Sequence, residues 1–262
     1  MEAAFFDLDK TVIAKASMVA FGRPLYRAGL VSRWLVLRAL WGQLVYLQLG
    51  HSDAQMEKSR AAVLRLTKGW DQAKVSAVVR DALDEVIEPI VYEEALALIR
   101  THREAGRRVF IVSASPIEVV APLAAYLQVD DAIATRARVD EHGRYTGEVD
   151  FSSHGANKVI AMEELAERYD LDLAASYAYS DSVTDLPMLE AVGHPVAVNP
   201  DRELRRAAVE REWEVLTFAL EVPLRSRVPM PSPGQTAAGA AGLAGIGAGL
   251  AAWWYLRRPR RP

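Results

Sequence analysis

Short apolar runs alternate with helical stretches along most of this chain, and that alternation limits the folds open to it. Between the runs, residues 92–106 and 157–170 have apolar residues at helical spacing. The pattern predicts an α/β fold whose core is a Rossmann-like three-layer parallel sheet flanked by helices. The predicted strands are Ala3 to Leu8, Arg108 to Val112, Ser176 to Tyr179, Pro195 to Val198 and Glu214 to Phe218.

Two segments interrupt this alternation. Residues 15–88 are helical in pattern almost throughout, which predicts an inserted helical cap, and the catalytic core is then residues 1–14 and 89–221. The most apolar part of the cap, residues 30–50, contains Arg33 and Arg38. A helix buried in the cap is favoured there, and an interfacial membrane helix is the alternative. The second interruption, residues 136–150, predicts a β-hairpin.

The C-terminal residues have a different composition. Residues 222–235 are rich in Pro, Ser and Gly and predict a linker. Residues 236–256 carry no charge and are long enough to cross a bilayer, which predicts a transmembrane anchor, with a flexible Ala/Gly tail as the alternative. The aromatic residues 253–255 and the basic tail, residues 257–262, are typical of a membrane interface. Gly245 and Gly249 could pair two anchors in a homodimer.

The chain is expected at the cell membrane with a single pass, but its orientation depends on two opposing signals. The basic tail favours a cytoplasmic C-terminus, which would place the body outside. The first ten residues carry acids where a signal peptide has a basic and then an apolar region. We therefore expect the catalytic domain on the cytoplasmic side.

Composition excludes several functions. The chain has no cysteine, which excludes disulfides, thiolate metal sites and a cysteine nucleophile. Its formal net charge is -3 even with four arginines in the last six residues, so the body is more acidic than the total. A general nucleic-acid binder is therefore not expected.

Polar residues follow the ends of three predicted strands, and a lysine begins a predicted helix. Ligands bind beyond the carboxyl ends of the strands in open α/β sheets, so we expect these side chains to converge. Clustered carboxylates repel one another, and Mg²⁺, which takes oxygen ligands, relieves that repulsion. A lysine, a serine hydroxyl and nearby backbone N–H groups would bind phosphate oxygens. The residues concerned are Asp7, Asp9, Ser113, Lys158, Asp181 and Asp185.

In their order and spacing these residues resemble the four motifs of the haloacid-dehalogenase (HAD) superfamily, namely "DLDKT", Ser113 after "VFIV", Lys158 in "HGANKV" and "DSVTD". The helical insert resembles the cap of the phosphoserine-phosphatase-like subfamily IB. The resemblance implies that Asp7 is the nucleophile and Asp9 the general acid and base. It also implies that phosphate binds at Thr11, Ser113, Ala114 and Lys158, and that Mg²⁺ binds at Asp7, Asp181 and the backbone carbonyl of Asp9, with Asp185 close by.

The chain departs from phosphoserine phosphatases at three places. Ala16 stands where those enzymes have a cap glutamate, Thr184 stands at the position of an asparagine, and the second motif reads "SAS" where theirs reads SGG. Recognition of phosphoserine is therefore left open, whereas hydrolysis is expected. Arg23 and Arg27 in the cap are either substrate contacts or surface residues, with the surface reading favoured. Lys10 has no assigned role.

These observations predict a Mg²⁺-dependent phosphatase that acts on a small phosphorylated substrate, which could be derived from a lipid, through an aspartyl-phosphate on Asp7. Two alternatives remain. One is a non-catalytic, membrane-anchored binding protein for a phosphorylated ligand, against which the presence of both Asp7 and Asp9 argues. The other is a phosphotransferase that passes the phosphoryl group to another acceptor.

Overall fold

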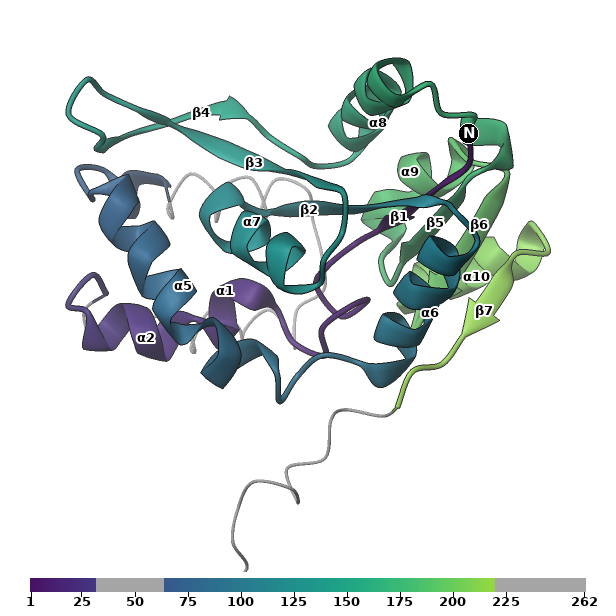
Figure 1. The fold of residues 1–262 in the computed structure, drawn as a ribbon, viewed down its shortest axis with the longest axis horizontal. Helices are drawn as coiled ribbons and strands as arrows, with labels where there is room; N and C mark the ends of the chain where they lie inside the picture. Colours follow the sequence, from purple (N-terminus) through teal and green to yellow (C-terminus); the bar gives the residue numbers. More distant parts are fainter. Residues whose placement is uncertain (32–63, 220–262) are drawn as a thin grey trace, which may run out of the picture. The chain divides into compact units, whose positions relative to one another are not determined.

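The computed structural model describes residues 1–31 and 64–219, and within them a seven-stranded sheet forms the core (Figure 1). Its strand order is β4-β3-β2-β1-β5-β6-β7. All neighbouring strands are parallel except β3 and β4, which are antiparallel. The predicted α/β fold with a mainly parallel sheet is therefore confirmed. The strands are β1 (Ala3–Phe6), β2 (Arg108–Pro116), β3 (Asp131–Val139), β4 (Tyr145–Phe151), β5 (Tyr177–Ser180), β6 (His194–Val198) and β7 (Glu214–Leu216).

Helices cover both faces of this sheet. The helices α6 (Glu93–Glu104) and α7 (Ile117–Tyr126) pack on one face, and α8 (Ala156–Tyr169), α9 (Leu186–Glu190) and α10 (Arg202–Glu210) pack on the other. Successive side chains of a strand point to opposite faces, so Phe6 of β1 enters the first core and Phe5 the second. Both faces of β1 are thus buried, which explains why the strand is wholly apolar.

Among residues 1–31 and 64–92, the structure describes the helices α1 (Ser17–Ala20), α2 (Gly22–Arg27) and α5 (Gln72–Ile87) (Figure 1). The side chain of Asp71 caps α5 by accepting a hydrogen bond from the N–H of Lys74 at 2.9 Å. Leu25 of α2 and Val79 of α5 are buried in the core that includes α6 and α7. Residues 32–63, and with them nearly all of the predicted apolar helix at 30–50, lie outside the described residues.

Two strand predictions were too short. The strand β2 continues to Pro116, so Ser113 lies inside a strand rather than at its end. It continues because β3 runs beside it and pairs Thr135 with Pro116 after a shift in register. The hairpin forms from β3 and β4, but β3 begins at Asp131 and also joins the main sheet. The helix α7 follows directly after Pro116.

Among residues 1–31 and 64–219, no helix has both the length and the apolar character needed to cross a membrane. The predicted linker, anchor and basic tail, residues 222–262, lie outside the described residues.

His102 of α6 is a buried histidine whose pKa gives a pH-dependent stability. Its Nε2 atom lies 2.7 Å from the hydroxyl of Tyr179, and its Nδ1 atom has no partner among the described residues. Burial, assisted by the charge of Arg107, lowers the pKa of His102 from 6.5 to about 4. Because the pKa in the folded state lies below that in the unfolded state, protonation favours unfolding. This contribution to stability is complete above pH 6.5 and is lost as the pH falls toward 4.

We therefore expect wild-type protein to lose about 3 kcal/mol more unfolding free energy between pH 7 and pH 4 than His102→Gln, which cannot titrate. Urea unfolding of both proteins across this range measures the difference. The same pH slope in the two proteins would contradict the assignment.

Candidate active site

A buried lysine joins two of the predicted site carboxylates. The ammonium of Lys158 donates to Asp7 Oδ1 at 2.7 Å and to Asp185 Oδ2 at 2.8 Å. Lys158 is only 1% exposed, and Asp7 and Asp185 are 7% and 3% exposed. Burial alone would lower the pKa of Lys158, but the two carboxylates outweigh burial and the net effect is a raised pKa. Lys158 is therefore a charged group fixed between two acids.

The sheet topology brings these residues together from distant parts of the chain. The strands β1 and β5 are parallel neighbours, and the N–H of Asp7 donates to the carbonyl of Tyr179 at 2.9 Å. Asp7 and Asp181 therefore leave the sheet at the same edge. Beyond β5, a short 3₁₀ turn, η2 (Val183–Asp185), carries Asp185, and the hydroxyl of Ser180 donates to Asp185 Oδ2 at 2.8 Å. That oxygen thus accepts from both Ser180 and Lys158.

Asp9 has a different set of partners. Its Oδ1 accepts from the N–H of Ser17 at 2.6 Å, and its Oδ2 accepts from the hydroxyl of Ser115 at 2.9 Å. The hydroxyls of Ser17 and Ser115 lie 2.8 Å apart. The motif reading included Asp9 but gave no role to Ser17 or Ser115. The second motif reads "SAS", and its second serine, Ser115, was the one sequence feature that pointed to this contact.

The pKa values of Asp7 and Asp181 are both raised. Burial raises the pKa of Asp181 to about 7, and the charges of Asp185 and Asp201 add to this while Lys10 opposes it. Burial also raises the pKa of Asp7 well above its usual value; Lys158 opposes this shift, and the charges of the other three site carboxylates add to it. The ammonium of Lys10 lies 4.0 Å from Asp181 Oδ2, so this residue contributes a second positive charge to the site.

The donors at this site fit a magnesium ion held by few protein ligands. No group of three or more His, Cys, Asp or Glu among the described residues is arranged to hold a metal ion. Both carboxylate oxygens of Asp9 accept hydrogen bonds, whereas among the described residues Asp7 and Asp185 each accept on one oxygen. The candidate ligands are therefore the free oxygen of Asp7, the carboxylate of Asp181 and the carbonyl of Asp9, with Asp185 close by. Mg²⁺ keeps several waters and is commonly bound by one or two carboxylates, so such a set suffices. A cation there would also offset the excess negative charge.

Of the other predicted phosphate-binding residues, Ser113 is linked to Asp9 through Ser115. Ser113 is buried, and its hydroxyl oxygen accepts from the N–H of Ser115 at 3.1 Å. Thr11 is fully buried, and its Oγ1 atom has no partner among the described residues. Ala114 is exposed, and its carbonyl accepts from the hydroxyl of Thr135 at 2.8 Å.

The two cap arginines lie on α2 and are exposed. Arg27 lies 3.5 Å from Glu85 of α5, an ion pair between two exposed side chains. This contact agrees with the surface reading of Arg27.

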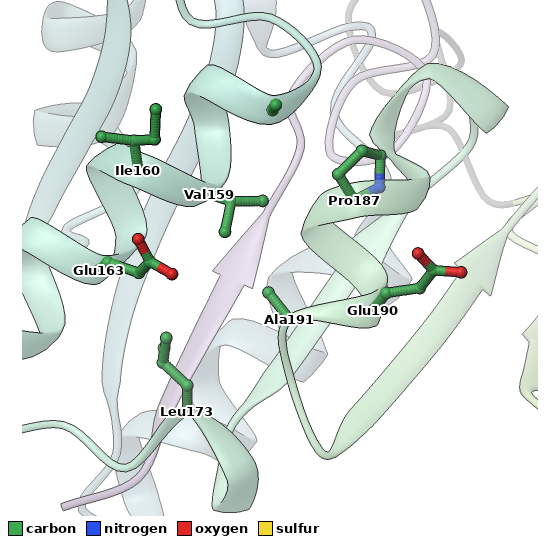
Figure 2. A pocket seen from close by; sticks show the side chains of 8 residues that line it. Val159, Ile160, Glu163, Leu173, Pro187, Glu190 and Ala191 are labelled. Carbon is green, nitrogen blue, oxygen red and sulfur yellow. The ribbon is translucent and has the colours of Figure 1, made fainter.

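An open groove between α8 and α9 is separate from the site (Figure 2). Val159 and Ile160 of α8 line it opposite Pro187 and Ala191. None of the predicted site residues lines this groove. Lys158, one residue earlier in α8, instead contacts Asp7 and Asp185.

This chain is similar to known proteins both in sequence and in fold. The family model described as haloacid dehalogenase-like hydrolase matches residues 4–190. The chain is 47% identical to a protein of Streptomyces azureus named for inhibition of morphological differentiation, over 98% of this chain and 94% of that protein. It is 46% identical to a protein of Mycobacterium tuberculosis named as a probable phosphatase, over 98% and 89%. It is 35% identical to a protein of the same species named phosphoserine phosphatase, over 92% and 77%.

Solved structures show a similar fold. A protein of unknown function from Bordetella pertussis matches with a TM-score of 0.70 and 31% identity, over 82% of this chain and 97% of that one. A substrate-bound phosphoserine phosphatase matches with a TM-score of 0.57 and 20% identity, over 86% and 95%. At that identity the second match supports the fold alone.

Proposed function

The chain belongs to the haloacid dehalogenase-like hydrolases, and from this premise we propose that it is a phosphatase that hydrolyses a small phosphomonoester through an aspartyl-phosphate on Asp7. The observation that carries the proposal is the buried Lys158 between Asp7 and Asp185. Burying three charged groups costs free energy unless they are paired. Buried clusters of charged groups like this one are typical of functional sites. A lysine fixed beside a nucleophilic carboxylate can bind an incoming phosphate and hold the carboxylate in place.

The reaction proceeds in two steps. A carboxylate oxygen of Asp7 attacks the phosphorus atom, the bond from phosphorus to the ester oxygen breaks, and Asp9 gives its proton to the leaving oxygen. Asp9 then accepts a proton from water, whose oxygen attacks the phosphorus atom, and the bond to Asp7 breaks. Inorganic phosphate leaves, and both aspartates regain their starting forms.

Direct support for hydrolysis would come from phosphate release from an aryl phosphate by the full-length protein with Mg²⁺. A panel containing phosphoserine, lysophosphatidate and simple sugar phosphates would then identify the substrate class. If phosphate appears only when a second hydroxyl compound is present and that compound becomes phosphorylated, the protein is a phosphotransferase. Tight binding without turnover would favour a binding protein.

We propose that Mg²⁺ binds at Asp7, Asp181 and the carbonyl of Asp9. When bound, it would shield the negative charge of the phosphate as Asp7 approaches. A ligand that binds only the folded state stabilises it, by about 2.7 kcal/mol at one hundred times its dissociation constant. Mg²⁺ is therefore expected to raise the melting temperature of wild-type protein by several degrees, and a chelator to reverse the rise.

The matched variant for this prediction is Asp181→Asn, which removes one proposed ligand without changing the size of the side chain. Its melting temperature should not respond to Mg²⁺ below millimolar concentrations. An equal rise in both proteins would show that the ion binds elsewhere.

We also propose that residues 236–256 anchor the protein in the cell membrane with its catalytic domain in the cytoplasm, where a small phosphorylated substrate, including one derived from a lipid, would be available. The support is the uncharged stretch followed by aromatic and basic residues. Truncation after Gln235 is expected to move the protein from the membrane fraction to the soluble fraction. Identical fractionation of the full-length and truncated proteins would contradict the anchor.

A further inference from the structure

Two serine side chains from distant parts of the chain meet at Asp9. Ser115 lies in β2, and Ser17 is the first residue of α1. Ser17 is fully buried and Ser115 is 7% exposed. Together they supply a hydrogen bond to each oxygen of the Asp9 carboxylate: the N–H of Ser17 binds Oδ1 and the hydroxyl of Ser115 binds Oδ2. The side chain of Asp9 is thereby held at both of its oxygens.

The direction of each hydrogen bond follows from the number of protons. A serine hydroxyl can donate one hydrogen bond, and the hydroxyl of Ser115 donates to Asp9. The contact of 2.8 Å between the two hydroxyls therefore has Ser17 as the donor and Ser115 as the acceptor. The result is a chain of donors from Ser17 to Ser115 to Asp9. A hydrogen bond that ends on a carboxylate is stronger than one between neutral groups, and accepting a hydrogen bond from Ser17 makes Ser115 a better donor.

This arrangement acts on the residue that must move a proton. A general acid works only within hydrogen-bond reach of the leaving oxygen, and an aspartate side chain free to rotate spends part of its time elsewhere. A side chain locked by packing and by supporting hydrogen bonds keeps the required geometry. A glycine at position 115 would have no hydroxyl with which to do this.

We propose that Ser115, supported by Ser17, is a positioning residue that orients Asp9 for protonation of the leaving group. This role rests on the proposed function. Because Ser17 begins α1, the orientation of Asp9 is also linked to the placement of this helix. Both serines contact Asp9 but are assigned no part in bond making or proton transfer, so they are positioning residues and not catalytic residues. Their effect passes through the carboxylate of Asp9.

The test compares two substrates whose leaving groups differ in their need for a proton. A simple alkyl phosphate leaves as an alkoxide and needs protonation, whereas p-nitrophenyl phosphate leaves as a stable phenolate. The quantity measured is kcat/KM, which reports the formation of the aspartyl-phosphate and excludes its later hydrolysis. Ser115→Ala should lower kcat/KM for the alkyl ester by about 10- to 100-fold. For the aryl ester the loss should be no more than about threefold, since little general acid catalysis is needed there.

Two further variants separate positioning from a general structural effect. Ser115→Thr keeps the hydroxyl and should recover most of the activity on the alkyl ester. Ser153→Ala removes the hydroxyl of another fully buried serine, one whose Oγ has no partner among the described residues, and should leave the ratio of the two substrates unchanged. Ser17→Ala keeps the backbone N–H to Asp9 and should have a smaller effect than Ser115→Ala on the alkyl ester.

Equal losses on the two substrates in Ser115→Ala, or no recovery in Ser115→Thr, would overturn the positioning role while leaving the phosphatase assignment intact. If wild-type protein hydrolyses neither ester, the proposed function fails, and the positioning role fails with it.

Discussion

Replacing Asp7 by asparagine is expected to lower the rate of phosphate release at least about 1,000-fold, because the variant retains the shape of the side chain but lacks the attacking carboxylate. The fold should survive the change. Lys158 still has Asp185 as a partner at 2.8 Å, and burial already raises the pKa of Asp7, which shows that its charged form is costly in this site. Initial rates of phosphate release with an aryl phosphate and Mg²⁺ measure the effect.

A carboxylate-to-amide change on the surface provides the control for this prediction. Asp84 of α5 is exposed, so Asp84→Asn makes the same chemical change away from the site. It should leave the rate within about twofold of wild type, as surface substitutions usually do. Similar rates for Asp7→Asn and wild type would rule out Asp7 as the nucleophile.

Replacing Lys158 by methionine is the second change with a large expected effect. Methionine fills a similar volume without charge, so the variant leaves Asp7 and Asp185 buried without their shared cation. Removing one partner of a buried ion pair typically costs about 3–5 kcal/mol of unfolding free energy. Activity should also fall by about 100-fold or more, because a fixed positive charge beside the phosphate is lost. Urea unfolding without Mg²⁺ and phosphate release with Mg²⁺ measure the two effects.

A double-mutant cycle with Asp185→Asn shows whether the loss of stability comes from the unpaired acids. In Lys158→Met combined with Asp185→Asn, only one buried carboxylate is left without a cation. The combined loss of unfolding free energy should therefore be smaller than the sum of the single losses by about 1 kcal/mol or more. Lys74→Met, which removes an exposed lysine from α5, should change stability little. Additive losses in the cycle would contradict the pairing of Lys158 with Asp185.

The sequence was sufficient to predict that Asp7, Lys158 and Asp185 lie close together. Asp7 and Asp181 follow buried apolar strands, and parallel neighbouring strands end at one edge of a sheet. Lys158 was predicted from its motif, and its place near the start of α8 agrees with that prediction. These predictions depended on short-range sequence patterns, which residue types reveal, and on one general rule about where parallel strands end.

The partner of each side chain could not be read from the sequence in the same way. Asp185 was expected to support a metal ion, and the structure shows its Oδ2 accepting from Lys158 and Ser180. Ser17 and Ser115 are 98 residues apart, and no local pattern indicates that their hydroxyls meet. Such contacts depend on how β2 and α1 pack in three dimensions.

The backbone also differed from expectation where tertiary contacts overrode local preference. Ser113 seemed to end an apolar strand, but β3 pairs with the residues beyond it and extends β2 to Pro116. Lys10, which had no assigned role, adopts a left-handed backbone conformation with φ of 64°. Residues other than glycine seldom adopt this conformation, and here it accompanies the contact of Lys10 with Asp181.

The most direct test of the central claim is a search for the covalent intermediate itself. Protein mixed with an aryl phosphate is quenched in acid within milliseconds and digested, and the peptide that contains Asp7 is weighed by mass spectrometry. We expect this peptide to carry one phosphoryl group. The labelled fraction should be higher in Asp9→Asn, where water is no longer activated, and the label should be absent in Asp7→Asn. Turnover of the ester without a phosphoryl group on this peptide, in wild type and in Asp9→Asn alike, would contradict an aspartyl-phosphate mechanism.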